Sequence, residues 1–308
     1  MDRIVSLLPA ATEIVAGLGL LERLVGRSHE CDHPASASSV PVLTAPRSPL
    51  EGSSEAIHQA VMTRIEAALS VFEVDADALR EAAPDLILTQ DLCDVCAVSR
   101  DDVTTALGDR GPQLVNLRPV CLDDIFEDIR RVGMLLEREA LAVRWARELE
   151  DRAQRVAPSP PARPTVLALE WVAPPMVGGL WMHEVIELAG GEAIGPLPGT
   201  PAQTLSPSEL AACNPEVVVV KPCGMTTAES RREVTSLQAL LPWSQWPRLR
   251  GAFLVDGHHY FNRPGPRIVE SIEVLAACLA PDGAWADAHG HDIWRFEAEG
   301  PLTALRAG

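Results

Sequence analysis

The chain has 308 residues, of which 47% are hydrophobic and 22% charged, with a formal net charge of −17 at pH 7. Such values are typical of a globular protein with one large domain or two ordinary ones, and the negative charge argues against nucleic acid or an anionic membrane as a partner. No apolar run is long enough to cross a bilayer, and the seven scattered cysteines do not form a disulfide framework. We therefore expect reduced thiols and no membrane insertion.

The first part of the chain alternates short apolar strands with helices. Strands are predicted at residues 3–9, 23–28, 84–90 and 113–117. Helices are predicted at residues 11–20 and 54–69. Continuous apolar strands separated by helices indicate a parallel sheet that is covered on both faces.

The N-terminus resembles a signal peptide because it is apolar and follows an early arginine. However, Glu13 interrupts the apolar stretch, and Pro9 divides it into a strand-like half and a helix-like half. We interpret this segment as the first strand and helix of the fold. The expected location is therefore cytoplasmic for the chain as given, or periplasmic or cell-surface if the native start lies upstream.

Residues 122–155 contain no proline and only one glycine. Ile125, Ile129 and Val132 recur at helical spacing, with acidic residues early and arginines late, as the helix dipole favours. The pattern predicts one long helix, roughly 50 Å in length at 1.5 Å per residue. Such a spine between two lobes favours a modest hinge motion.

The alternation then resumes. Strands are predicted at 165–169, 216–220 and 252–255, with helices around 181–190, 236–241 and 266–279. The predicted fold is thus α/β, with two lobes that have parallel sheets and are joined by one long spine helix. The expected domains are an N-terminal α/β lobe at 1–120, the spine helix at 121–157, a C-terminal α/β lobe at 158–283 and a C-terminal tail at 284–308.

Ligands of open parallel sheets bind outside the carboxyl ends of the strands. In the first lobe these segments are 28–34 and 90–96, and in the second they are 170–175, 221–224 and 256–266. Nine of the sixteen His, Cys and Trp residues of the two lobes fall in these segments. We expect the five segments to converge on one crevice.

The first lobe carries a group of soft nitrogen and sulfur donors. The candidate metal ligands are His29, Cys31, His33, Cys93 and Cys96. Only the last two form a CxxC pair, whereas a structural zinc site normally has two closely spaced pairs. Three interpretations stay open: a bound metal or cluster, a redox-active CxxC pair, or loop cysteines that pack against the cleft wall.

The second lobe carries aromatic side chains directly after its strands. Trp171 and Trp181 flank Pro-Pro and Gly-Gly pairs, which suits either packing in the core or a flat apolar ligand approached by the backbone. Residues 256–266, DGHHYFNRPGP, collect rare ring types at the end of a strand. Their two prolines also fix a corner before the next helix. The segment thus serves both structure and ligand.

The sequence contains no recognisable catalytic motif. A nucleophile elbow GxSxG, a phosphate loop GxxxxGK[ST] and a dinucleotide-binding GxGxxG after the first strand are all absent. Asp256 and His258 are a candidate acid–base pair, but no nucleophile is placed near them by the sequence. We predict that the protein is not an enzyme.

Four segments resemble a known family: residues 3–34, 84–98, 174–191 and 256–276. They are similar, in order, to the vitamin B12-binding substrate proteins of ABC transporters, which belong to the helical-backbone periplasmic binding proteins for metal chelates. The HECDHP and CDVC stretches resemble a cobalamin-binding branch of that family whose members often lack an export signal. The resemblance implies two Rossmann-like lobes, one spine helix and a ligand between them, without catalysis.

The resemblance also implies positions that contact the ligand. They are His33, Asp91, Leu92, Trp171, Trp181, Asp256, His258, Tyr260, Phe261 and Arg263. Aromatic residues of the relatives are replaced in the first lobe by His33 and by Asp91 or Leu92, which favours coordination over stacking. His29 or His33 is a candidate axial ligand of cobalt. Arg263 is expected to bond an amide or carboxylate of the ligand, and Arg267 to pair with Glu270 or Glu273.

The expected function is non-catalytic binding of a corrinoid, cobalamin or cobinamide, in the cleft between two lobes, as a carrier, salvage or uptake component. One alternative is haem, a siderophore or another metal chelate. Another is a metal-binding enzyme or metallochaperone that uses the His/Cys cluster. The expected partner is a small-molecule metal chelate, with an ABC transporter permease as a candidate and no nucleic acid. The protein is expected to be a monomer, and a metal ion at the His/Cys cluster is a further candidate.

Overall fold

A computed structural model describes residues 1–47, 52–66, 71–90, 111–156, 163–280 and 283–306. The chain divides into two compact units. Unit 1 comprises Met1–Gly52, Ala56–Pro119 and Asp123–Glu148, and unit 2 comprises Ser53–Glu55, Val120–Leu122 and Leu149–Gly308. Within the described residues, no helix combines the length and the apolar character needed to cross a membrane.

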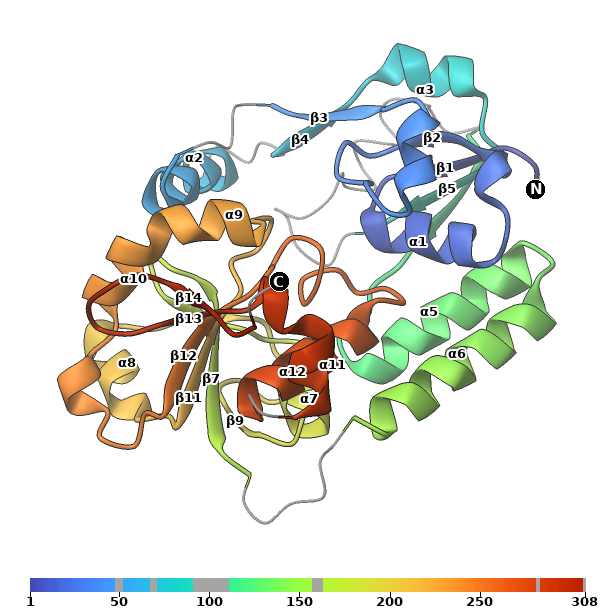
Figure 1. Ribbon diagram of the computed structural model, residues 1–308. Coiled ribbons are helices and arrows are strands. Elements are labelled where there is room, and N and C mark those ends of the chain that lie inside the picture. Colours follow the sequence, from blue (N-terminus) through green and yellow to red (C-terminus); the bar gives the residue numbers. More distant parts are fainter. Residues whose placement is uncertain (48–51, 67–70, 91–110, 157–162, 281–282, 307–308) are drawn as a thin grey trace. The chain divides into compact units, whose positions relative to one another are not determined.

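Unit 1 is built on a parallel sheet in the order β2-β1-β5-β6 (Figure 1). Its strands are β1 (Ile4–Ser6), β2 (Leu24–Arg27), β5 (Leu86–Thr89) and β6 (Gln113–Asn116). All four lie within the apolar runs of the sequence, so the predicted parallel sheet is confirmed. The central strands β1 and β5 are wholly buried. Apolar side chains are removed from water on both faces of a parallel sheet that helices cover.

The two faces of this sheet carry different helices. The remaining elements of unit 1, apart from two further helices described next, are α1 (Pro9–Gly17), α2 (Ser54–Glu66), α3 (Ala76–Ala82), two 3-10 turns (Leu21–Arg23 and Ala35–Ser39) and the antiparallel pair β3 (Thr44–Pro46) and β4 (Phe72–Val74). Leu79 of α3 packs with Val5 and Ile87, whereas Thr12 of α1 bonds Ser6 on the opposite face. The pair β3–β4 was not predicted.

The prediction of one long helix is wrong. The segment folds as α5 (Leu122–Leu135) and α6 (Glu139–Gln154), which Figure 1 shows side by side. Glu137 turns the chain with a φ of 58°, and a Cβ on Gly133 would lie 2.1 Å from the Cβ of Ala142. The single glycine of the segment thus allows the second helix to fold back on the first. A residue in the left-handed conformation at the end of a helix is usually glycine. Because this position is a glutamate, the sequence did not indicate that a helix ends there.

Unit 2 contains a larger mixed sheet in the order β10-β8-β7-β11-β12-β13-β14, with β9 also paired to β7. The described strands are β7 (Thr165–Trp171), β8 (Met176–Val177), β9 (Glu192–Ile194), β10 (Gln203–Thr204), β11 (Val217–Val220), β12 (Gly251–Leu254), β13 (Trp294–Phe296) and β14 (Thr303–Ala304). The three predicted strands are β7, β11 and β12, which are adjacent and parallel.

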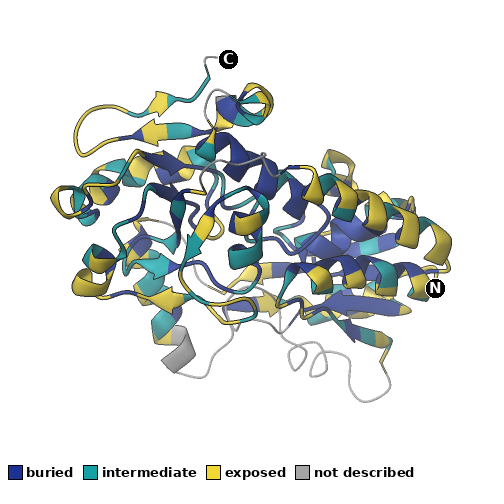
Figure 2. Ribbon diagram, turned by 90° about the horizontal axis from the view of Figure 1, so that it is seen from below, coloured by how far each residue is buried: buried dark blue, intermediate teal, exposed yellow. Residues whose placement is uncertain are grey.

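Helices cover both faces of this second sheet. They are α7 (Met182–Leu188), α8 (Pro207–Cys213), α9 (Thr227–Ser230), α10 (Val234–Leu240), α11 (Ile268–Leu279) and α12 (Ala284–His289), with 3-10 turns at Arg231–Glu233, Trp243–Gln245 and Gly290–Asp292. Figure 1 shows α8 and α10 on one face and α7 and α11 on the other. In Figure 2 the buried residues follow the strands and the inward sides of the helices. Each unit therefore has its own core.

The segment expected as a C-terminal tail is part of this fold. It supplies α12 and then β13, which pairs antiparallel with β12 and is followed by β14 at the sheet edge. His289 at the end of α12 bonds Glu273 of α11, and Glu273 also accepts two hydrogen bonds from Arg152. The strand β13 thus covers β12, which would otherwise present unpaired backbone groups.

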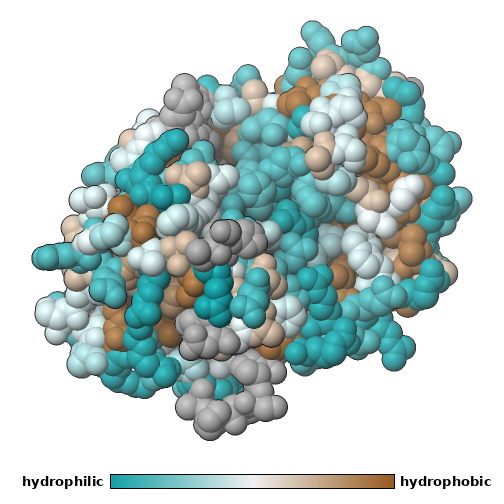
Figure 3. Space-filling model, in the orientation of Figure 1, coloured by the Kyte–Doolittle hydropathy of each residue, from teal (hydrophilic) through white to brown (hydrophobic). Residues whose placement is uncertain are grey.

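Few large apolar side chains are exposed in the described residues. Besides residues near loops, the helices α5 and α6 expose Met134 and Val143, and Leu197 is 70% exposed. On the face drawn in Figure 3, hydrophobic and hydrophilic residues are interspersed. Singly exposed apolar residues are normal for a protein surface.

Candidate functional site

The carboxyl ends of three adjacent parallel strands in unit 2 gather the polar side chains of interest. β7 ends at Glu170 and Trp171, β11 is followed by Lys221, and β12 leads through Val255 into residues 256–263. We call residues 256–263 the histidine loop. Its start packs closely on the end of β11, since a Cβ on Gly257 would lie 2.1 Å from the carbonyl oxygen of Pro222. Glycine is therefore required at this position.

Asp256 organises the two histidines of this loop. Its Oδ1 accepts the backbone N–H groups of His258 (2.9 Å) and His259 (2.7 Å), and its Oδ2 lies 2.8 Å from Nδ1 of His259. Burial acts to raise the pKa of Asp256, but the hydrogen bonds and charge of His259 outweigh it and hold that pKa below its ordinary value. The expected pair of Asp256 with the His258 ring is replaced by the Asp256–His259 pair.

The Asp256–His259 pair fixes one tautomer of the ring. A carboxylate at Nδ1 holds the proton there, so the lone pair of neutral His259 is on Nε2. The same carboxylate makes the imidazole a better electron donor. His259 is half-buried and oriented in the way that metal-binding histidines usually are.

His258 is held differently. Nη2 of Arg263 lies 2.8 Å from Nε2 of His258, so the guanidinium donates to that nitrogen. Arg263 is only 6% exposed. In this structure its guanidinium fixes the His258 ring, and its bond to an amide or carboxylate of a ligand stays a prediction.

Tyr260 is the single tyrosine of the chain and belongs to the histidine loop, which leads toward α11. The guanidinium of Arg267 lies over its ring at 4.6 Å, and Arg267 also donates to Glu270 at 3.1 Å, as expected. Burial raises the pKa of the Tyr260 hydroxyl; the charge of Arg267 opposes this and that of Glu270 adds to it. Tyr260 is half-buried, so part of its ring faces outward.

Two expected ring contacts lie in the interior of unit 2. Phe261 is 0% exposed and has a φ of 52°, and its N–H donates to Ser271 of α11. Trp181 is 6% exposed, and its Nε1 donates to the carbonyl oxygen of Phe261 at 2.7 Å. These two residues hold the end of the histidine loop. Their surface is not available for stacking on a ligand in this conformation.

Trp171 differs from Trp181 because it is only half-buried. Its Nε1 donates to the carbonyl oxygen of Ala173 at 3.2 Å, which fixes the indole beside the turn after β7. Trp171 therefore offers ring surface near the carboxyl end of β7. Together with Tyr260 it supplies the aromatic surface of unit 2 at this edge.

A polar network beneath the histidine loop was missed by the sequence analysis. Nζ of Lys221 donates to Glu170 at 3.1 Å and to Oδ1 of Asn262 at 2.7 Å. The 221–224 segment was identified as a strand end, but its lysine was not singled out. The available signal was a charge of opposite sign at the ends of two neighbouring strands.

In unit 1 the side chains of the 28–34 segment point in different directions. Cys31 is 1% exposed and accepts a hydrogen bond from Thr12 at 3.0 Å, so its thiol lies in the core. His29 bonds Thr44 through Nδ1 at 2.7 Å, and burial lowers its pKa, with Glu30 opposing and Arg27 adding to the shift. His33 is exposed.

The predicted metal cluster is therefore not assembled by the described part of unit 1. Within the described residues, no group of three ligand atoms includes His29, Cys31 or His33. The physical reason is that residues 28–31 form a turn, in which the N–H of Cys31 donates to the carbonyl oxygen of Ser28, so the two-residue spacing of His29, Cys31 and His33 does not bring their side chains to one side. Asp91, Leu92, Cys93 and Cys96 lie outside the described residues.

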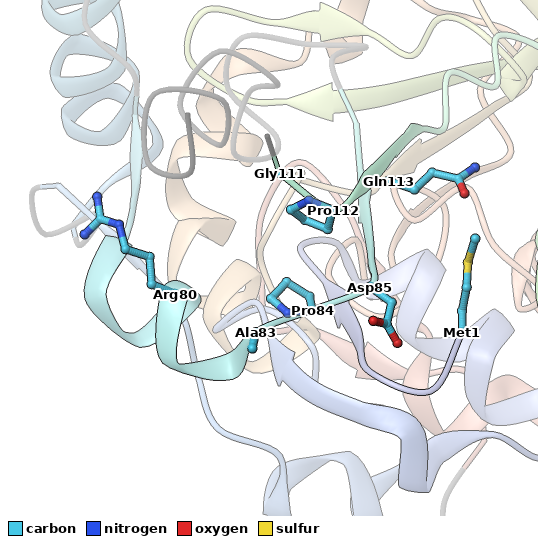
Figure 4. A pocket seen from close by; sticks show the side chains of 8 residues that line it. All are labelled: Met1, Arg80, Ala83, Pro84, Asp85, Gly111, Pro112 and Gln113. Carbon is cyan, nitrogen blue, oxygen red and sulfur yellow. The ribbon is translucent and has the colours of Figure 1, made fainter. Parts of the chain in front are cut away.

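An open hollow of about 650 Å³ lies at the amino ends of β5 and β6 in unit 1 (Figure 4). Its charged lining residues are Arg80 and Asp85. The Asp85 carboxylate accepts the backbone N–H groups of Asp2 and Arg3, which lowers its pKa. Since ligands of parallel sheets bind at the carboxyl ends of strands, this hollow lies at the wrong edge for the expected site.

Comparisons with known proteins agree with this fold. Residues 4–240 match the model of a family described as periplasmic binding protein. No curated protein matches the chain. The periplasmic haem-binding protein RhuT from Roseiflexus sp. RS-1, in apo form, is 22% identical with a TM-score of 0.67, covering 94% of this chain and 99% of its own.

Two further solved structures are named for different ligands. A periplasmic haem-binding protein from Pseudomonas aeruginosa is 18% identical, with a TM-score of 0.68 over 92% of this chain and 94% of its own. The periplasmic vitamin B12-binding protein BtuF of Vibrio cholerae is 19% identical, with a TM-score of 0.62 over 90% and 96%. At these identities the likeness shows the fold alone.

The family match covers most of the chain, and it gives the expected cytoplasmic location no support. It agrees with the α/β architecture. The chain belongs to the periplasmic binding protein family.

Proposed function

We propose that the protein binds a metal tetrapyrrole without transforming it, and that His259 is an axial ligand of the metal. The observation that carries this proposal is the 2.8 Å pair between Asp256 and Nδ1 of His259, which directs a basic Nε2 away from the carboxylate. Neutral imidazole suits both cobalt and iron. Trp171 and Tyr260 supply ring surface for the macrocycle, and His33 stays a proposed contact from unit 1.

The tetrapyrrole is a corrinoid or haem. The motifs of the sequence resemble those of vitamin B12-binding proteins, whereas several of the similar solved structures, including two of those above, are named for haem. His259 favours neither metal, because imidazole is a common axial ligand of each. Both candidates fit a binding protein that passes its ligand to an ABC transporter permease, and neither requires the cytoplasmic location.

Titration with cobalamin, cobinamide and haem, followed by visible absorbance and gel filtration, tests the proposal. We expect one of them to co-elute at stoichiometric ratio with a spectrum typical of imidazole ligation. Cobinamide lacks the nucleotide base of cobalamin, so His259 can take the vacant axial position. If none of the three co-elutes, the proposal is wrong.

Metal analysis of protein purified without chelators tests the alternative of a metallochaperone or metal-dependent enzyme. Stoichiometric zinc or iron that is retained without a tetrapyrrole would support that alternative. The candidate donors for it are His29, His33, Cys93 and Cys96, since the thiol of Cys31 is in the core.

A further inference from the structure

Lys221 is the most deeply buried charged residue at the carboxyl edge of the unit 2 sheet. Its side chain is 0% exposed, whereas the Glu170 side chain that it contacts is 22% exposed. Lys221 lies under the turn after β8, where a Cβ on Gly178 would be 3.2 Å from both Cε of Lys221 and Oε2 of Glu170. The ammonium group is therefore enclosed by protein and lies too deep to touch a ligand.

Burying this ammonium group is not a general requirement of the fold. Removing an ion from water costs several kcal/mol, and a buried ion pair can often be replaced by apolar residues without loss of stability. Lys221 has one carboxylate partner, Glu170, and its shorter bond, at 2.7 Å, goes to the neutral amide of Asn262. This second bond indicates a role beyond charge compensation.

Asn262 connects Lys221 to the two ends of the histidine loop. Its Oδ1 accepts from Nζ of Lys221, while its Nδ2 donates to the carbonyl oxygens of Lys221 (3.2 Å) and Gly257 (2.8 Å). Because an ammonium group only donates, it fixes which end of the amide is oxygen. Lys221 thereby orients the Nδ2 donor that ties Asn262 back to Gly257, between Asp256 and the two histidines.

We propose that Lys221 is a positioning residue for ligand binding: acting through Asn262, it holds the histidine loop in the conformation that presents His259. This inference rests on the proposed function, since it assigns a purpose to the loop geometry. The Asp256–His259 pair sets the tautomer of the His259 ring. The Lys221–Asn262 bond fixes the backbone conformation of the loop and therefore the position of that ring. A ligand then binds a loop whose ordering cost has already been met in the free protein.

The test is a pair of variants that separates loop positioning from stability. Lys221→Met leaves the Glu170 carboxylate without its lysine, whereas Lys221→Met combined with Glu170→Gln removes both charges and restores much of the stability. We expect both variants to bind the tetrapyrrole about tenfold more weakly, on the scale of one charged hydrogen bond. Their bound spectra should lose imidazole ligation in part. A double variant with wild-type affinity and spectrum would overturn the inference.

The matched control is Glu216→Gln, at the opposite end of β11. Glu216 directly precedes the strand and pairs with Arg248 at 3.1 Å and Arg250 at 3.3 Å, so the variant removes a charge from the end of β11 that is opposite to Lys221. We expect unchanged affinity and spectrum. Equal weakening in this control would show that any lost charge pair of unit 2 has the same effect, which would also overturn the inference.

Hydrogen exchange of the ligand-free protein separates failure of this inference from failure of the proposed function. The amides of His258, His259 and Phe261 should exchange faster in the double variant than in wild type or in Glu216→Gln. If wild type binds none of the tetrapyrroles, the proposed function fails, and the exchange rates still decide whether Lys221 holds the loop. Unchanged exchange in the double variant contradicts the role of Lys221.

Discussion

The 28–34 segment of unit 1 and the histidine loop of unit 2 are alike in composition but differ in how their side chains are held. In unit 1, Cys31 is hydrogen-bonded in the core and His29 is bonded to the hydroxyl of Thr44. In unit 2, the carboxylate of Asp256 faces Nδ1 of His259, whereas the carboxylate nearest to His29, that of Glu30, faces Nε2 at 3.4 Å. Composition at a strand end therefore indicates a candidate site, and the partner of each ring nitrogen decides whether it is prepared for a metal.

Buried aspartates show the same contrast. Asp256 accepts two backbone N–H groups and faces His259, and these interactions lower its pKa. Asp128 of α5 is 7% exposed, its Oδ2 has no hydrogen-bond partner among the residues that the structure describes, and Oδ1 lies 4.0 Å from Nη1 of Arg131. Burial raises the pKa of Asp128 to about 7, with Arg131 opposing and the acidic neighbours Asp124 and Glu127 adding to the shift. A buried carboxylate is stabilised only where donors surround it.

The largest expected effect is on the ligand. His259→Ala removes the axial nitrogen, and we expect about hundredfold weaker tetrapyrrole binding, on the scale of one strong metal–ligand contact. His29→Ala should change affinity less than twofold, because that ring is engaged with Thr44. Absorbance titrations of both variants measure the difference. A larger loss in His29→Ala than in His259→Ala would reverse the comparison between the two segments.

The next effect concerns stability. The pKa of Asp128 is raised in the folded protein above the unfolded value of 3.8, so the folded state binds the proton more tightly. Stability is therefore expected to fall as pH rises from about 4 to about 7, and to level off above that. Asp128→Asn should remove this decline and stabilise the protein at pH 8 by about 2 kcal/mol, a value reduced for the nearby arginine and residual solvent.

Urea unfolding at pH 5 and pH 8 measures this effect. Asp151→Asn on α6 is a suitable control, because Asp151 is exposed and its loss should leave the pH profile unchanged. If wild type and Asp128→Asn have parallel stability profiles between these pH values, Asp128 is ionised at little cost and the contrast with Asp256 disappears.

The apolar parallel strands β1, β2, β5, β6, β7, β11 and β12 were predictable, whereas the turn between α5 and α6 was not. A run such as Val217–Val220 is apolar on both faces and has few alternatives to a buried strand. The turn depends on Glu137 in a left-handed conformation and on the fit of Gly133 against Ala142, which is a contact between positions nine residues apart. Strands of two or three residues, such as β13, carry too little pattern to be recognised.

The candidate site was predictable in its position but not in its bonding. Rules for parallel sheets identified the segments that follow β7, β11 and β12. The network of Glu170, Lys221 and Asn262 joins residues that are 41 and 51 positions apart, so no local spacing announces it. The sequence likewise did not predict that Trp171 is half-buried and Trp181 buried, because both follow apolar runs and lie beside glycines or prolines.

The smallest expected effect comes from a variant that changes the carboxylate of Asp256 and leaves the His259 ring in place. Asp256→Asn keeps the size of the side chain and an oxygen for the N–H groups of His258 and His259, but an amide does not favour the Nδ1–H tautomer as a carboxylate does. We expect about tenfold weaker binding and an axial-ligand band shifted toward that of a weaker donor. Weakened binding with an unchanged band would mean that Asp256 acts only on the loop backbone. In that case the carboxylate partner would not distinguish His259 from His29. The difference between the two strand ends would then depend on the conformation of the histidine loop alone.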